Sequence, residues 1–430
     1  MAKELKQVYA SLFIDENELQ IVVAEYFNTR FNIIRVDKVK MEGIINFKIN
    51  DFERVVQIIK DTIEYSSKKI GASITKTILV LPPFGFKRFP LRVSVVPNGG
   101  IVTKKDIAKA VTSSLKTKVD GNSIVINSSI IKYTINGIST FRIPDKEICD
   151  ELIVDIDLLC ADKELTIDYI NAVTKAGLEV LDITLNNYAI AKEVVLFEES
   201  LKQNIILLDI GTSYTYLTLL TKGKLTTSEI IYDGLYNIID HVYDNLGIPK
   251  DNAARLIKYN VDYNSPYPDD AVFAWGDDKD NYSITVKQLT DTVKEPLNKY
   301  LDKLLTMCKP IIDSGLTSFI VVGEGAKMNT LVKELQIQGH TYVKSYYPEA
   351  IGIRDSSMCA VYGALYVYRE KALLNDLNVS CVDIAEYDSI VDLKVVDNQG
   401  ESITSKIKKL FENYRDKGGL KWQSDLSTIK

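Results

Sequence analysis

The sequence predicts an α/β protein of two lobes, with a small α+β module inserted into the first lobe. At 430 residues, 46% of them apolar and 26% charged, the chain exceeds the size at which a single core usually divides into domains. Segments 8–25 and 204–220 share an outline of strand, tight turn and strand. Between residues 84 and 162 the pattern changes to strands around one helix, which indicates a separate module.

The first lobe begins with a predicted hairpin. Apolar residues alternate over 8–25 on either side of a polar turn, and a further strand is expected at 32–40. Segment 52–65 has apolar residues at the i, i+3, i+4, i+7 spacing of an amphipathic helix. The strand predicted at 77–81 ends at Pro82, which cannot continue a helix or a central strand, so we place a boundary there.

Two helices are expected in and after the module. The helix at 104–115 starts after Thr103, and Asp106 stands three residues further on, as in a capping box. The helix at 167–176 is followed by Gly177, the residue type that commonly closes a helix in the left-handed conformation.

The second lobe is expected to be richer in helix. We predict a helix at 235–246, a loop at 264–281 because Asp, Pro, Asn and Gly gather there, and a long helix at 286–312 broken at Pro296. The tail from residue 375 has no strong core pattern until about residue 402, and we interpret it as a flexible linker.

Composition excludes several functions. A net charge of −6 and a pI near 5.3 argue against a globally basic nucleic-acid binder. The five cysteines are widely spaced and odd in number, which favours reduced cytosol over a disulfide framework. Two histidines are too few for a multi-histidine zinc site and make a Ser/His or Cys/His hydrolase a poor candidate. Because no window approaches about 18 uninterrupted apolar residues, any membrane contact is expected to be peripheral.

The segment DIGTS at 209–213 is a candidate phosphate-binding turn. A strand that ends in Asp209 and turns sharply at Gly211 can present successive backbone N–H groups to phosphate oxygens. Asp209 would hold a magnesium ion through water, and Thr212, Ser213 and Thr215 add hydroxyl groups. Taken alone, the string fits an ordinary hairpin better than a phosphate-binding turn.

A second glycine turn follows a buried strand at 319–322. It consists of Gly323, Glu324, Gly325 and Ala326 and leads into a helix, where glycine allows a base or ribose to pack on the backbone. Two such turns, separated by a helix-rich insertion, are the arrangement of an actin-like nucleotide cleft.

These segments resemble the bacterial cell division protein FtsA over about residues 8–415. DIGTSYTYLTLL looks like its second phosphate loop and VVGEGAKMNTL like its adenosine loop. Further family segments are matched in order and spacing by DGLYNIIDHVYDNLGI with AARLIK, TVKEPLNKYL, CAVYGALYVY and INGISTFRIPDKEICDEL. The position of the insertion distinguishes the chain from MreB and from actin-like kinases.

The resemblance implies a two-lobed actin-like (ribonuclease H-like) fold divided into subdomains. The implied division is 1–82 with 163–200 as subdomain 1A, 83–162 as inserted subdomain 1C, 201–233 with 309–374 as subdomain 2A, 234–308 as subdomain 2B, and 375–430 as linker and amphipathic C-terminal segment.

It also implies an ATP site with magnesium. The residues carried over as cofactor-binding are Asp209, Gly211, Thr212, Ser213, Thr215, Gly234, Arg255, Lys258, Gly323, Glu324, Gly325 and Ala326, with Asp209 holding the metal through water.

Several positions depart from the family pattern. Phe13 stands where the family has an aspartate, and Asp15 where it has a glycine; Tyr216 replaces another aspartate. Other replacements are Thr212 and Ser213 for glycines, Tyr214 for a threonine, and Arg255 for a glutamate, whereas Lys258 is retained. Because no evident group replaces the lost metal and phosphate contacts, we expect ATP binding with weak or absent hydrolysis.

Segment 402–415 predicts a basic amphipathic helix. Apolar residues recur on one face and lysines lie mostly off it, and residues 401–421 carry six basic and three acidic groups. This is typical of an interfacial membrane anchor, although a helix docked on the body has the same pattern. The expected membrane residues are Ile403, Ile407, Leu410, Phe411, Tyr414, Lys406, Lys408 and Lys409.

The resemblance implies a cytoplasmic adaptor on the inner membrane face at the division site. Its implied partners are the FtsZ C-terminal peptide, other copies of itself and an anionic membrane. Leu297 replaces a basic residue that usually follows the Glu-Pro pair, so Lys299 and Lys303 are the expected peptide contacts. A PilM-like pilus scaffold and an actin-fold ATPase or kinase remain alternatives.

Overall fold

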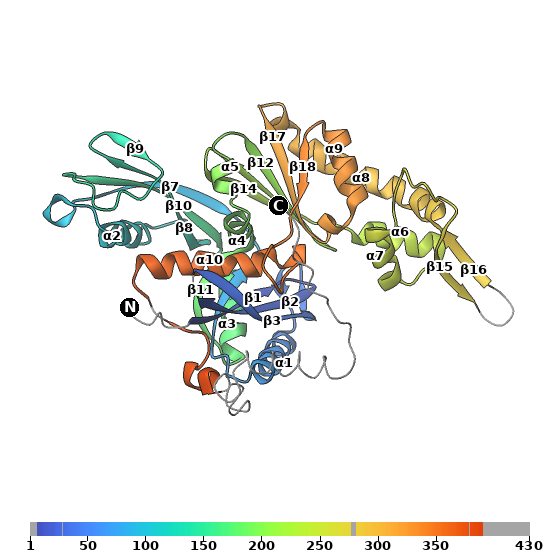
Figure 1. Ribbon diagram of the computed structural model, residues 1–430, viewed down its shortest axis with the longest axis horizontal. Coiled ribbons are helices and arrows are strands. Elements are labelled where there is room, and N and C mark those ends of the chain that lie inside the picture. The colour runs from blue at the N-terminus through green and yellow to red at the C-terminus, as the bar shows by residue number, and fades with distance from the viewer. Residues whose placement is uncertain (1–6, 28, 277–280, 378, 390–430) are drawn as a thin grey trace, which may run out of the picture.

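The chain folds around two five-stranded sheets, one in each lobe (Figure 1). A computed structural model describes residues 7–27, 29–276, 281–377 and 379–389. The first sheet has the strand order β11-β6-β1-β2-β3 and the second β14-β13-β12-β17-β18. In each sheet the central strand has an antiparallel neighbour on one side and a parallel neighbour on the other: β1 lies between β2 and β6, and β12 lies between β13 and β17.

The first lobe confirms the predicted hairpin and its neighbours. Its elements are β1 (Gln7–Ile14), β2 (Glu18–Phe27), β3 (Arg30–Lys40), β4 (Ile44–Ile45), β5 (Lys48–Ile49), α1 (Phe52–Ile70), β6 (Lys76–Leu81), α3 (Lys163–Lys175) and β11 (Glu179–Leu185). Helix α3 begins earlier than predicted because the carboxylate of Asp162 accepts the N–H of Leu165 at 3.0 Å and caps it.

The second lobe contains the other strand–turn–strand unit. Its elements are β12 (Asn204–Ile210), β13 (Thr215–Thr221), β14 (Lys224–Ile231), α6 (Tyr236–Leu246), α7 (Lys250–Tyr259), β15 (Ala271–Gly276), β16 (Asn281–Thr285), α8 (Val286–Ile312), β17 (Thr317–Gly323), η2 (Gly325–Lys327), α9 (Asn329–Gly339) and β18 (Tyr342–Ser345). The hairpin β15–β16 projects at one end of the molecule (Figure 1).

A four-stranded sheet at the opposite end forms the inserted module (Figure 1). Its elements are β7 (Lys87–Val95), η1 (Asn98–Gly100), α2 (Lys104–Ser114), β8 (Ser123–Ile135), β9 (Ile138–Thr140) and β10 (Leu152–Asp162), with a hydrophobic cluster of their own. The predicted capping box is present, since Asp106 accepts the N–H of Thr103 at 2.9 Å.

Helices α4 (Asn186–Glu193) and α10 (Cys359–Leu374) connect the lobes; α5 (Leu196–Glu199) and η3 (Ser356–Met358) are short companions. One core cluster contains both helices and residues of both sheets, such as Leu12 and Leu207. The subdomain division stays a prediction. Within it, α10 was given to the second lobe, but α10 packs mainly on α4, β1 and β6.

Two predictions for the second lobe were wrong. The expected loop at 264–281 contains β15, because Val272 and Phe273 pack against the second-lobe core. Helix α8 is not broken at Pro296: it is one helix with that proline inside it. A proline removes one backbone donor, but the buried residues Val293 and Leu297 continue the same core contact on both sides of it.

The tail after α10 is not simply a linker. Cys381 is fully buried and donates its N–H to the carbonyl oxygen of Val8 at 2.8 Å, and Val382 forms a β-bridge with Ile74. Two apolar residues are too few to show a periodic pattern, which is why the sequence did not reveal this docking. The predicted membrane helix at 402–415 lies outside the described residues.

All five cysteines are free and buried. Among the helices that the structure describes, none is long and apolar enough to cross a membrane.

Replacing Gly363 with alanine is expected to destabilise the chain. A Cβ at this position would stand 2.2 Å from the carbonyl oxygen of Ala189, so α4 and α10 would have to separate. Although alanine favours a helix interior, overpacking should lower the free energy of unfolding by about 1–3 kcal/mol, measurable by urea titration. Gly121→Ala is the control, since nothing lies within 4 Å of its Cβ position; equal stability of the two variants would contradict this packing.

Candidate functional site

The end of strand β12 is the point where the predicted site residues converge. Asp209 pairs with Tyr216 on β13 and with Val322 on β17. Gly323 ends β17 at a φ of 77°, and a Cβ there would stand 2.5 Å from Oδ1 of Asp209. Only glycine therefore fits this approach. The backbones of Gly234 and Gly325 pack directly on the turn at Gly211 and on Ile210.

The turn after β12 is fixed by its own backbone. The N–H of Gly211 donates to the carbonyl oxygen of Tyr214 at 2.9 Å, and the carbonyl oxygen of Thr212 accepts the N–H of Tyr236 at 2.8 Å. Thr215 points away into the core, where its hydroxyl donates to the carbonyl oxygen of Asp233 at 2.8 Å and lies 2.6 Å from the hydroxyl of Tyr300. Its predicted role in holding a cofactor is therefore not matched by its position.

The turn between β1 and β2 meets the turn between β12 and β13. Asn17 donates from Nδ2 to Oγ of Ser213 at 3.0 Å. The Tyr216 hydroxyl donates to Asp15 Oδ1 at 3.0 Å, and the Tyr214 hydroxyl donates to a carboxylate oxygen of Glu16. We call these three pairs the interlobe latch: Asp15–Tyr216, Glu16–Tyr214 and Asn17–Ser213. Each pair joins the first lobe to the second.

Glu324 gathers three lysines on the other side of the cleft. Its carboxylate lies 3.2 Å from Nζ of Lys38 and 2.9 Å from Nζ of Lys327, and it also pairs with Lys258. Burial alone would raise the pKa of Glu324, but the three ammonium groups outweigh burial and hold the pKa well below its usual range. The carboxylate is therefore ionised and internally neutralised.

Two carboxyl groups near the turns have raised pKa values. Burial raises the pKa of Asp15 from 3.8 to about 6, against the lowering effect of the Glu16 N–H. Burial also raises the pKa of Asp209 to about 7, and the charges of Asp15, Glu18 and Glu324 add to the increase. Asn186 at the start of α4 approaches Asp209, with Nδ2 3.5 Å from Oδ2.

The remaining predicted residues lie at varying distances from this centre. Lys258 reaches Glu324, whereas Arg255 is exposed on α7. Ala326 is buried, and its carbonyl oxygen accepts the hydroxyl of Tyr347 at 2.7 Å. Phe13 is only 4% exposed and belongs to the first core, so it offers the cleft no polar group.

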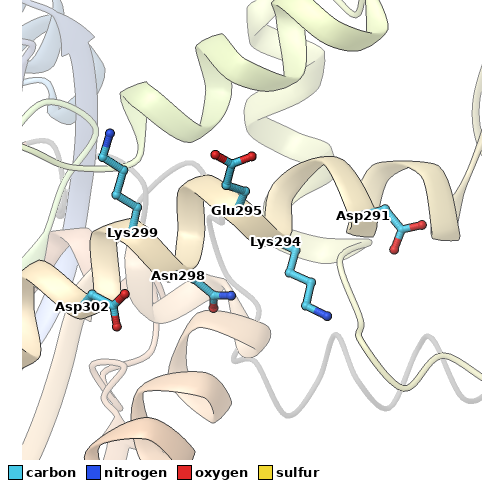
Figure 2. A pocket seen from close by; sticks show the side chains of 6 residues that line it. All are labelled: Asp291, Lys294, Glu295, Asn298, Lys299 and Asp302. Carbon is cyan, nitrogen blue, oxygen red and sulfur yellow. The ribbon is translucent and has the colours of Figure 1, made fainter.

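The expected peptide contacts lie on α8. Lys299 lines a surface hollow of about 550 Å³ together with Asp291, Lys294, Glu295, Asn298 and Asp302 (Figure 2). Lys303 instead pairs with Asp233 at 2.8 Å. Leu297 is fully buried in the second core, so its side chain cannot meet a partner.

Besides the latch residues Glu16 and Asn17, sequence reasoning missed four residues around Asp209 and Glu324. These are Lys38 on β3, Lys327 on η2, Asp355, which pairs with Lys327 at 2.7 Å, and Asn186. Lys327 stands beside the glycine turn and could have been found from the motif. The other three come from segments far apart in sequence, and no local pattern marks them.

The chain is similar in sequence to bacterial FtsA proteins. It is 24% identical to the cell division protein FtsA of Staphylococcus epidermidis over 395 residues, which cover 89% of this chain and 84% of that relative. The FtsA of Bacillus subtilis is 22% identical over 363 residues, covering 81% of this chain and 80% of the relative. The chain is FtsA-like. No protein-family model matches it.

A solved structure bears on the fold of this FtsA-like chain. A chain of the PilM–PilN type IV pilus biogenesis complex superposes with a TM-score of 0.53 at 14% identity, covering 84% of this chain and 98% of the solved chain. At that identity the likeness concerns the fold alone, and it confirms the predicted two-lobed actin-like class.

An actin-like fold implies ATP with magnesium, but the residues on the phosphate side of this FtsA-like cleft do not fit a triphosphate. The side chains of Asp15 and Glu16 already accept hydrogen bonds from strand β13 and from the turn before it. With Asp209 they place three carboxyl groups where polyphosphate needs donors and cations. Lys38 and Lys258, the nearby cations, are paired with Glu324.

Asp209→Asn is expected to stabilise the FtsA-like chain, most strongly at pH 8. Because the folded-state pKa of Asp209, about 7, exceeds its ordinary value of 3.8, the stability linked to its proton is present at low pH and is lost as the pH rises through 7. The amide carries no such penalty, so the apparent Tm should rise by at least about 2 °C at pH 8 and by less at pH 5.

Thermal unfolding at both pH values measures the effect, with Asp244→Asn, exposed on α6, as the control. A loss of stability at pH 8, or the same gain at both pH values, would contradict the assignment.

Proposed function

We propose that this chain is a cell division adaptor that self-assembles and tethers FtsZ filaments to the cytoplasmic face of the membrane at the division site. The observation that carries the proposal is the similarity to FtsA proteins over 89% of the chain. The likeness to the PilM–PilN complex concerns the fold alone, so it favours no pilus function.

We place the FtsZ peptide in the hollow on α8. Lys294 and Lys299 line it (Figure 2) and are exposed. Lys303 is instead neutralised by Asp233. A peptide carboxylate would therefore meet Lys299 first. Asp291 and Glu295 on the same surface suit a basic side chain of the same peptide.

Lys299→Ala is expected to weaken FtsZ-peptide binding about 1.4- to fivefold, because an exposed ion pair contributes about 0.2–1 kcal/mol. Fluorescence anisotropy with a labelled C-terminal FtsZ peptide measures this. Lys309→Ala is the matched control, since Lys309 lies on the same helix outside the hollow and pairs with Asp313. If both variants bind the peptide with the same affinity as the unaltered chain, the peptide does not bind in this hollow.

Self-assembly is supported by an apolar surface at the end of the inserted module. The loops at this end of the sheet lie close together. Ile101 forms a β-bridge with Ile148, and Leu152 pairs with both Val95 and Ile135. Exposed apolar side chains of this region are Val96, Ile101, Ile138, Phe141, Ile143 and Ile148. Gathered apolar exposure of this kind is typical of a protein–protein interface.

The membrane anchor is proposed from the sequence of residues 403–414. Truncation after Gly400 should abolish pelleting of the chain with anionic vesicles, because it removes the apolar face and its lysines. Replacing Lys406, Lys408 and Lys409 with glutamine should weaken binding to anionic but not neutral vesicles, since each contributes about 1 kcal/mol near such a surface.

Liposome co-sedimentation measures both changes. Lys104, Lys105 and Lys109, exposed on α2, provide a matched triple glutamine control. Undiminished pelleting of the truncated chain would refute the anchor.

A further inference from the structure

We propose that this chain holds its own cleft closed: the interlobe latch occupies the phosphate side, so lobe closure does not depend on a nucleotide. The inference goes beyond the adaptor function. It also explains why residues expected to hold ATP are engaged with one another.

The latch fills the space between the two turns with paired polar groups. Every pair takes one member from the β1–β2 turn and one from the β12–β13 turn or strand β13. The acceptors Asp15 and Glu16 stand in for an anionic ligand, and the Tyr214 and Tyr216 hydroxyls serve as the donors. Glu16 also accepts the N–H of Phe47 at 3.3 Å. The polar groups of the latch thus find their hydrogen-bond partners within the protein.

An aromatic cluster closes the side of the latch. The Phe47 ring, 1% exposed, belongs to the first lobe. It lies 4.6 Å from the ring of Tyr214 and 6.3 Å from the rings of Tyr216 and Tyr232, all three in the second lobe. A polyphosphate entering here would have to displace packed apolar surface as well as break the polar pairs.

Ion pairs close the other side. Lys38 on β3 of the first lobe pairs with Glu324, which follows β17 of the second, and with Glu18 at 2.8 Å. Lys258 on α7 forms an ion pair with the same Glu324 carboxylate. Neutralised lysines attract a phosphate weakly, whereas opening the pairs would leave the half-buried Glu324 without its counter-charges.

Latch variants test the closure in the free, full-length chain. Tyr214→Phe with Tyr216→Phe keeps both rings and removes the two hydroxyl donors. Hydrogen exchange at the amides of residues 14–18 and 211–216 should become about tenfold faster or more. The control is Tyr263→Phe with Tyr368→Phe, whose buried hydroxyls have no hydrogen-bond partner among the described residues. Unchanged exchange in the latch variant would overturn the proposal.

A second variant keeps the test decisive if the double change unfolds the chain. Asn17 is exposed and contacts Ser213 across the cleft, so Asn17→Ala removes one pair without touching the core. Faster exchange in both turns supports the latch. Faster exchange in the 14–18 turn alone would overturn it.

Nucleotide independence is tested on the unaltered chain by calorimetric titration with Mg-ATP to about 1 mM. We expect no saturable heat and no protection of either turn from exchange. Saturable binding within this range would overturn the latch and leave the adaptor proposal standing. Absence of vesicle or peptide binding would overturn the adaptor proposal and leave the latch standing. The two failures are therefore distinguishable.

Discussion

The contact between Gly363 and Ala189 fixes the crossing of α10 and α4, the two helices packed between the sheets in the shared core. Helix α10 holds β1, since the Ser11 hydroxyl donates to the carbonyl oxygen of Val361 at 2.5 Å. Helix α4 reaches the end of β12 through Asn186 and Asp209. Because the two helices cross at backbone contact, the turns that follow β1 and β12 are brought face to face. The interlobe latch depends on this crossing.

The charges of the cleft follow from the same geometry. Bringing the two strand ends together places Asp15, Glu18 and Asp209 close to one another, and their mutual repulsion adds to burial in raising the pKa values of Asp15 and Asp209. Near Glu324 the opposite happens, because Lys38, Lys258 and Lys327 supply compensating charge. One side of the cleft favours bound protons, and the other is neutral through ion pairs.

The local sequence pattern predicted most helices and strands. The features that it missed depend on contacts between residues far apart in the sequence. The alternation at 8–25, the apolar strand and tight turn at 204–220 and the helical spacing at 52–65 were sufficient, because runs of apolar residues between polar turns mark buried strands and the spacing marks the buried face of a helix. Pro296 and the tail at Cys381 were misjudged because distant core contacts outweigh local preference. The glycine turns located the site, but the Asp15, Glu16 and Asn17 partners became visible only when two turns about 200 residues apart met.

A closed cleft constrains how an adaptor of this kind could be regulated. A ligand shifts a conformational equilibrium only by its differential affinity for the two states, so a nucleotide that cannot enter the cleft cannot drive lobe motion. Any control must then act through surfaces away from the cleft. The α8 hollow and the apolar end of the inserted module lie on separate parts of the molecule (Figure 1). Under the adaptor proposal, binding at either surface would change assembly through the contacts made there and not through lobe motion.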